Sequence, residues 1–302
     1  MLRRIDTTAH VRHFEPWRRQ LGECLGLPAL AVTLPWPLAW RALRALATRG
    51  HGFGDETTQA LAIGAQLGFV AAPTSWALRH RLTRMIDQID PALSATRGDG
   101  WMDRHLAVSG DALPRAPCVV VGFHYGTGFW SLRHLRRHGH RVSFVSAPID
   151  TAQWREEPLR LAFARWRQRR VASAGGAPVI YVGGSVEKIR AALREGTSVL
   201  ALIDVPEATT SPVRVRLLGH DVWLPDGILR IAAAEGVPLI GFVGSFDART
   251  GARRLCFTRL PGDPDTALDA LTALLEGALR DDPAGWHFWS QWPRFRAAAA
   301  PG

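Results

Sequence analysis

The sequence predicts an α/β fold in which a mixed, mostly parallel central sheet is flanked by helices. From residue 117 onward, short β-branched runs alternate with segments of helical periodicity, which is the pattern of parallel crossover units. Runs such as CVVV (118–121) and SVLALI (198–203) are apolar throughout, as is typical of strands buried on both faces. The chain is 47% hydrophobic, which is enough to form the core that such a sheet requires.

The N-terminal part differs from this pattern. We expect residues 1–54 to form an amphipathic, membrane-contacting segment and residues 55–302 to form one α/β domain. Residues 24–40 carry no charge and include Trp36, Trp40 and three helix-breaking prolines, while no cleavage site of a signal peptide is evident. This composition favours an interfacial segment whose two tryptophans lie at the level of lipid headgroups. The alternative is a helical hairpin buried in the core.

The remaining elements follow from periodicity and from capping residues. Residues 55–93 predict two helices, the second ending at Asp90–Pro91 because proline disfavours helical backbone before it. We expect strands at 118–121, 142–147, 179–182, 198–203, 213–218, 238–246 and 254–260. Helices are expected at 130–138, 154–170, 185–194, 227–235 and 265–280. The runs at 213–218 and 254–260 are expected to add antiparallel strands.

Charge and cysteine content narrow the function classes. The chain of 302 residues carries 37 Lys and Arg against 27 Asp and Glu, a formal charge of +10, and nearly all the cations are arginine. Arginine forks suit phosphate and carboxylate groups, so an anionic partner such as a lipid surface is expected. The three cysteines are widely spaced and show neither a disulfide framework nor a zinc pattern, which favours a reducing compartment and no metal site.

The stretch VVVGFHYGTGFW (119–130) contains the strongest candidate for catalysis. It begins as a buried strand, and then His124 follows in a glycine-rich loop before a helical pattern resumes. A titratable side chain at the carboxyl end of such a strand is placed where α/β enzymes hold their chemistry. Neutral imidazole can remove a proton from a hydroxyl or an amine, so His124 is a candidate general base; a structural histidine is the alternative.

Carboxylates that could orient His124 follow two other predicted strands. Asp204 and Glu207 lie just after 198–203, and they would face His124 if the two strands are neighbours; Asp204 could instead cap its own loop. Asp150 is a weaker candidate at the end of 142–147. The basic run 165–170, ending in Arg170, is a candidate binding segment because it lies beside strand-end loops.

Several function classes lack their motifs here. There is no phosphate-binding Walker loop, no Gly-x-Ser-x-Gly nucleophile turn, and no dinucleotide-binding glycine spacing. Zinc-finger, helix-turn-helix and aromatic ribonucleoprotein patterns are also missing, so we expect no nucleic-acid partner.

The order of the blocks resembles the lipid A late acyltransferases (lauroyl/myristoyl type) of the lysophospholipid acyltransferase superfamily. The likeness runs from about residue 15 to the C-terminus and is strongest over 117–295. It rests on five blocks in sequence, which read VVVGFHYGTGFWSL, GHRVSFVSAPID, EGTSVLALIDVPEA, VRVRLLGHDVWLPDGILRIAAAEGVPLIGFVGSFD and WHFWSQWPRF.

This resemblance implies a membrane-associated enzyme at the cytoplasmic face of an inner membrane. Such an enzyme transfers an acyl chain from coenzyme A or acyl carrier protein to a lipid-like or glycolipid hydroxyl or amine, with no further cofactor. His124 would be the base, assisted by Asp204 or Glu207. The residues expected to contact substrate are Tyr125, Gly126, Thr127, Gly128, Phe129 and Arg170.

The sequence departs from the family at one position. The family places Asp or Glu five residues after the histidine, where this chain has Phe129. Either another carboxylate orients His124, or the chain is a diverged branch that binds lipid or acyl carrier protein without turnover.

Overall fold

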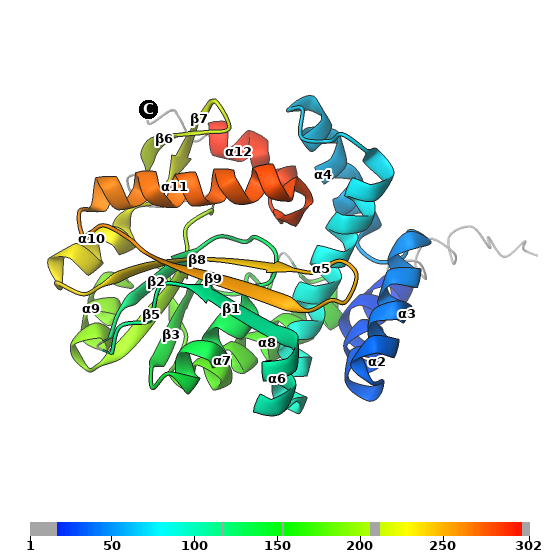
Figure 1. Ribbon diagram of the computed structural model, residues 1–302, viewed down its shortest axis with the longest axis horizontal. Coiled ribbons are helices and arrows are strands. Elements are labelled where there is room, and N and C mark those ends of the chain that lie inside the picture. The colour runs from blue at the N-terminus through cyan, green and yellow to red at the C-terminus, as the bar shows by residue number, and fades with distance from the viewer. Residues whose placement is uncertain (1–16, 116, 153, 206–211, 298–302) are drawn as a thin grey trace, which may run out of the picture.

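The computed structural model describes residues 17–115, 117–152, 154–205 and 212–297. A seven-stranded sheet runs through the centre of this part, with helices on both of its faces (Figure 1). In chain order, its strands are β1 (Leu106–Gly110), β2 (Val119–Gly122), β3 (Arg141–Ser146), β4 (Ile180–Tyr181), β5 (Thr197–Leu202), β8 (Leu239–Phe246) and β9 (Arg253–Arg259). An α/β fold with a mixed, mostly parallel sheet is therefore confirmed.

The strand order is β1-β9-β8-β2-β5-β3-β4, so β2 lies at the centre. Five neighbouring strands, from β8 to β4, are parallel, whereas β9 is antiparallel to β8 and β1 runs parallel to β9. The predicted antiparallel strand at 254–260 is thus confirmed. The run at 213–218 is also antiparallel, but it pairs only with β7 (His220–Leu224) in a separate hairpin as β6 (Val213–Leu217).

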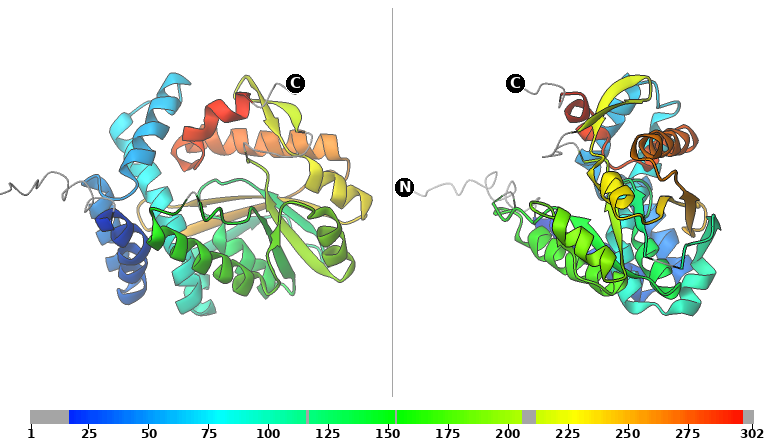
Figure 2. Two further views of the ribbon diagram at one scale, coloured as in Figure 1. Left: turned by 180° about the vertical axis from the view of Figure 1, so that it is seen from behind. Right: turned by 90° about the vertical axis from the view of Figure 1, so that its left-hand side faces the viewer.

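Helices connect these strands and cover the sheet, as the two views of Figure 2 show. Beyond the N-terminal helices they are α4 (Gly54–Gln66), α5 (Pro73–Thr96), α6 (Asp99–His105), α7 (Phe129–Arg137), α8 (Pro158–Gly175), α9 (Val186–Arg194), α10 (Gly227–Ala234), α11 (Pro264–Asp281) and α12 (Trp292–Ala297). The elements that the sequence did not predict include α6, α12, β1 and β7.

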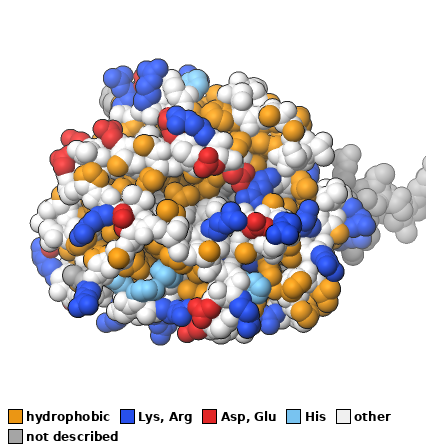
Figure 3. Space-filling model, in the orientation of Figure 1, with side chains coloured by type: hydrophobic (Ala, Val, Ile, Leu, Met, Phe, Trp, Pro, Cys, Tyr) orange, Lys and Arg blue, Asp and Glu red, His pale blue; other side chains and the backbone are white. Residues whose placement is uncertain are grey.

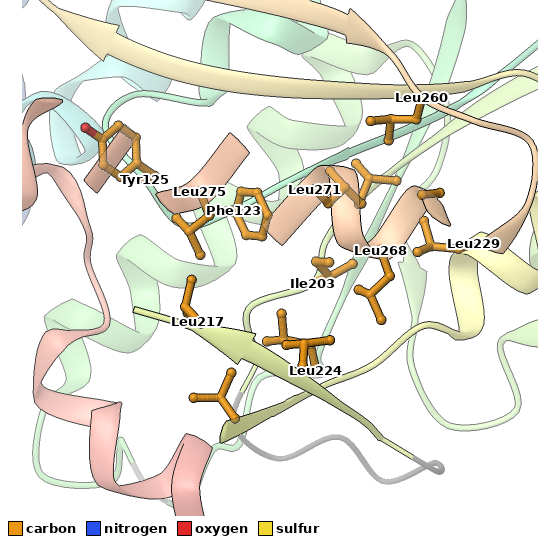
Figure 4. Packing of buried hydrophobic residues seen from close by; sticks show 14 of the residues in the cluster. Phe123, Tyr125, Ile203, Leu217, Leu224, Leu229, Leu260, Leu268, Leu271 and Leu275 are labelled. Atoms are coloured by element: carbon orange, nitrogen blue, oxygen red, sulfur yellow. The ribbon is translucent and has the colours of Figure 1, made fainter. Parts of the chain in front are cut away.

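Alternate residues of β2 belong to two different hydrophobic cores. Val119 and Val121 pack in the core that contains α9, α10 and α11, and Val120 packs in the core that contains α5, α6 and α7. Figure 4 shows part of the first core, where Phe123 and Tyr125 meet leucines of α11. Because β2 is buried on both faces, its apolar run is continuous rather than alternating.

The N-terminal segment corrects one expectation. Trp36 and Trp40, which were placed at headgroup level, are buried with only 5% and 2% of their surface exposed. Their indole N–H groups donate to the carbonyls of Thr250 and Arg249, both at 2.9 Å. These bonds satisfy the polar end of each ring inside the protein. The two tryptophans are therefore part of the core, as the alternative interpretation expected.

One helix runs from Trp17 to Thr33 and includes the π-helical turn Gly22–Gly26 and α2 (Leu27–Thr33). Pro28 does not break it: the Leu27 N–H bonds five residues back to the Gly22 carbonyl, and the Glu23 carbonyl, which the next N–H in that pattern would reach, accepts from Nε2 of Gln88 at 3.2 Å. Pro35 then separates α2 from α3 (Trp36–Thr48). None of the helices in the described ranges is both long enough and apolar enough to cross a bilayer.

Helix α5 corrects a second expectation. It continues through Pro91 to Thr96 instead of ending at Asp90. Proline removes the N–H that would bond to the carbonyl four residues earlier, which belongs to Asp87. Here Nη1 of Arg167, in α8, lies 3.4 Å from that carbonyl, so a side chain provides the missing donor.

Candidate active site

The register between β2 and β5 brings His124 and Asp204 together. Gly122 pairs with Leu202, and the Ile203 N–H donates to the Gly122 carbonyl at 3.0 Å. Two residues beyond this pair, on the same carboxyl edge of the sheet, stand His124 and Asp204. Parallel strands in this register make the two residues neighbours although 80 positions separate them in the chain.

The contacts of Asp204 fix the orientation of the imidazole. The His124 backbone N–H donates to both carboxylate oxygens, at 2.9 and 2.8 Å, and Nδ1 lies 2.9 Å from Oδ1. Because a carboxylate accepts, Nδ1 carries the proton and Nε2 is left as a proton acceptor. Asp204 is fully buried, whereas one third of the His124 side chain is exposed. The pair therefore has the geometry of a general base held by an acid.

A third partner comes from the C-terminal segment. The indole N–H of Trp286 donates to Oδ2 of Asp204 at 2.9 Å, and Trp286 itself is fully buried. The same segment forms a bridge pair with Tyr125, and the Gly126 N–H donates to the Gly285 carbonyl at 2.8 Å. Sequence reasoning treated this block only as a family signature and missed its role. The sequence signal for this role is the Trp-His-Phe order at 286–288.

Gly126 occupies a position that no other residue fits well. Its φ is +58°, and a Cβ there would lie 2.0 Å from the carbonyl oxygen of Gly244 in β8. Gly244 is equally restricted, since its own Cβ would meet the Thr127 carbonyl at 2.0 Å. The two backbones therefore approach closely only because both residues lack side chains. This contact fixes the loop that presents His124.

His287 secures the loop from the other side. Its backbone N–H donates to the His124 carbonyl at 2.9 Å, and its Nδ1 lies 2.7 Å from Nη1 of Arg84. A guanidinium can only donate, so Nδ1 accepts, and Nε2–H donates to the Gly126 carbonyl at 3.0 Å. Burial, together with the charge of Arg84, lowers the pKa of His287 to about 4. His287 is thus neutral near pH 7 and positions the loop.

A cavity of about 370 Å³ opens beside His124 between the sheet and helices α7 and α8. Its polar end contains His124, His287, Arg84, Asp87 and Arg167. The rest is mainly apolar, with walls that include Phe129, Leu132, Phe144, Val171, Leu200 and Leu202. A titratable pair at one end of an apolar slot suits a ligand that has a polar reactive group and a hydrocarbon chain.

The polar end is built around an ion pair between helices. Arg167 binds the Asp87 carboxylate with two nitrogens, at 2.9 and 2.8 Å. Burial alone would raise the pKa of Asp87, but the guanidinium of Arg167 outweighs this effect and holds the pKa well below its usual range. The charged pair joins α5 to α8 at the cavity wall.

The predicted substrate-contacting residues have different positions. Gly126, Gly128 and Phe129 line the cavity. Thr127 is fully buried and does not line it. Tyr125 contributes to the wall, but its hydroxyl is occupied by the carbonyls of Ala278 at 2.7 Å and Asp282 at 2.9 Å, and burial raises its pKa.

The remaining candidates lie elsewhere. Arg170 lines a separate surface hollow with arginines of α7 and is not part of the cavity wall at His124. Asp150 is exposed after β3 and bonds to the Ala152 N–H at 2.8 Å. Glu207 lies outside the described residues. Of the two acids that the structure describes, Asp204 is the one in contact with His124.

Comparison with known proteins finds no protein-family model and no curated protein that matches this chain. In the described part of the chain, no group of three or more His, Cys, Asp or Glu side chains could hold a metal ion.

Proposed function

We propose that the chain is a membrane-associated acyltransferase. It moves an acyl chain from a thioester of coenzyme A or acyl carrier protein to a hydroxyl or amine of a lipid-like or glycolipid acceptor. The observation that carries this proposal is the His124–Asp204 pair at the polar end of an apolar cavity. In this proposal Asp204, two residues after β5, takes the place of the acid that the resembled family keeps five residues after the histidine. Phe129, which stands at that position, lines the cavity.

The proposed reaction begins with proton transfer. Nε2 of His124 takes the proton of the acceptor hydroxyl or amine while the freed oxygen or nitrogen attacks the thioester carbonyl. Asp204 stabilises the imidazolium that forms. The tetrahedral intermediate then expels the thiolate, which receives the proton from His124, so the products are an acyl ester or amide and a free thiol.

Backbone amides are available for the oxyanion of that intermediate. Gly128 and Phe129 line the cavity at the start of α7. Within the described ranges, their N–H groups donate to no protein acceptor. Unpaired amides at a helix N-terminus favour negative charge, so they are suited to stabilise an oxyanion beside His124.

The activity assay uses the purified full-length protein, a panel of acyl thioesters and a membrane extract as acceptor. Replacing His124 with Gln should lower acyl transfer by at least about 10²-fold. Replacing exposed His51 in the same way serves as the matched control. Thioester consumption that is equal in the wild type and in His124→Gln would overturn the mechanism, and carrier binding without turnover would favour a non-catalytic lipid- or carrier-binding role.

An exposed apolar stripe supports the membrane part of the proposal. Trp17, Leu21 and Leu25 recur every four residues on the first described helix and are 46%, 46% and 53% exposed. Arg18 is exposed beside them. An apolar stripe with adjacent cations suits an anionic lipid surface, here the cytoplasmic face of an inner membrane.

A vesicle-binding assay tests this surface. Leu25→Ser should weaken partition to anionic vesicles by about tenfold, because a leucine side chain no longer enters the lipid interface. Val108, on β1, is an exposed residue of comparable character, and Val108→Ser is the control. If Leu25→Ser and Val108→Ser bind vesicles equally well, the N-terminal helix does not contact the membrane.

A further inference from the structure

A second polar hollow lies on the outer side of α7 and α8, away from His124. Its volume is about 340 Å³, and it is lined by four arginines with two serines and one acid, which are Arg133, Arg136, Arg137, Arg170, Ser94, Ser173 and Asp99. On the face drawn in Figure 3, basic side chains, in blue, stand beside acidic ones, in red. In this hollow the cations outnumber the acids.

Two of the four arginines have acidic partners. Arg133 donates to Asp99 at 2.6 Å, and also to the carbonyls of Ser94 and Arg97. Arg137 binds Asp103 at 2.5 Å. These contacts hold both side chains at the rim.

Arg136 and Arg170 differ from them, because both converge on Ser173. Arg136 donates to the Ser173 carbonyl at 2.8 Å, and Arg170 donates to its hydroxyl at 3.3 Å. Within the described ranges neither forms an ion pair with a carboxylate. In addition, Nε of Arg170 is shielded from solvent and has no hydrogen-bond partner. Two like charges and an unmet donor at one hollow call for an anion.

The helix ends do not fully account for this charge. Arg136 lies in the last turn of α7, where a helix dipole stabilises cations, whereas Arg170 lies before the last turn of α8. The end of α7 acts as about half a negative charge, which leaves part of the charge of Arg136 uncompensated and does not extend to Arg170.

We propose that this hollow binds a phosphate group, held between the guanidinium groups of Arg136 and Arg170. Planar guanidinium forks match the oxygens of a phosphate, and the Ser173 hydroxyl adds a third polar group. The hollow is separate from the cavity beside His124, but helices α7 and α8 contribute to the walls of both. Leu132 and Val171 line the cavity, whereas the adjacent residues Arg133 and Arg170 line the hollow. A bound phosphate would therefore join α7 to α8 behind the cavity wall.

The phosphate could belong to a lipid headgroup or to a free, soluble ligand. Calorimetric titration at constant ionic strength, with the full-length protein, separates these sources. One arm uses inorganic phosphate, and the other uses a water-soluble short-chain phosphatidic acid below its aggregation concentration. Chloride replaces phosphate in the reference titration. Saturable binding in both arms indicates recognition of the phosphate alone, and binding only in the second indicates a headgroup.

Variants connect that binding to the hollow. Arg136→Gln and Arg170→Gln should each weaken binding at least tenfold, and Arg170→Lys should give an intermediate loss because it keeps the charge without the fork. Arg169 is exposed on the same helix outside the hollow, so Arg169→Gln is the control with an equal loss of charge. No saturable binding in either arm, or losses that match those of Arg169→Gln, would overturn the proposal. Because the readout is binding, it does not depend on acyl transfer.

Discussion

At the scale of single residues, one buried carboxylate organises the candidate site. Asp204 receives hydrogen bonds from the backbone and ring of His124 and from the indole of Trp286. A buried charge is tolerated only when such donors surround it. Asp204 therefore stabilises the loop, and in the proposed reaction it also orients the base.

Replacing Asp204 with Asn separates these two roles. The amide N–H₂ would face Nδ1 of His124 and favour the tautomer with the proton on Nε2, which cannot act as a base. We expect acyl transfer to fall about 10³- to 10⁴-fold with the fold retained. Circular dichroism and the thioester assay, run together, check this expectation.

Another acid that follows a strand of the sheet provides the control for that variant. Asp150 also follows a strand of the sheet but is exposed. Asp150→Asn should leave the rate within about twofold, since ordinary surface changes have small effects. Comparable losses of acyl transfer in Asp204→Asn and Asp150→Asn would contradict the role of Asp204 in orienting His124.

At the scale of elements, the loop after β2 depends on its close approach to β8. Gly126 and Gly244 meet backbone to backbone, while the C-terminal segment closes the loop from the other side. Rigid elements on both sides hold the histidine in a single orientation, which a catalytic base requires.

Substituting glycines of this loop tests the contact. Gly126→Ala would place a Cβ 2.0 Å from the Gly244 carbonyl oxygen at a residue with positive φ. We expect a loss on the order of 3 kcal/mol in the free energy of unfolding, measured by urea denaturation. Gly128→Ala is the matched control, because its Cβ would meet Phe242 at an ordinary 3.6 Å. Equal stability of the two variants would contradict the close approach.

At the scale of the whole molecule, a buried ion pair joins helix α5 to the sheet. Asp90 of α5 and Arg253 of β9 are both fully inaccessible, and the guanidinium lies 4.2 Å from the ring centre of Trp36 and 5.5 Å from that of Trp101. Burial raises the pKa of Asp90, and the charge of Arg253 opposes that shift. Four elements thus meet at one pair of charges.

Breaking this pair should destabilise the whole fold. Asp90→Asn leaves Arg253 buried without its counter-charge, and we expect the free energy of unfolding to fall by about 3–5 kcal/mol. Glu187→Gln, which removes the exposed partner of Arg190, should cost less than about 1 kcal/mol. Denaturant unfolding of both variants makes the comparison. A loss in Asp90→Asn no larger than the loss in Glu187→Gln would mean that α5 is held to the sheet mainly by apolar packing.

The sequence by itself determined the class of the fold and the position of His124. Apolar β-branched runs alternating with helical periods predict strands and helices without reference to distant contacts, and the loop after CVVV marks the histidine. It also named Asp204 among three acids. Short elements such as α6, β1 and β7 were missed because five to seven residues give too weak a pattern.

Only the tertiary structure decided which groups meet. The β2–β5 register selected Asp204, and the C-terminal segment brought Trp286 and His287 to the loop from more than 160 positions away. Packing likewise buried Trp36 and Trp40, allowed α5 to pass through Pro91, and placed Arg170 outside the cavity. Local patterns describe which faces are apolar, but strand order and long-range hydrogen bonds depend on contacts between distant segments. For that reason the sequence could propose the base, while the fold identified its partner.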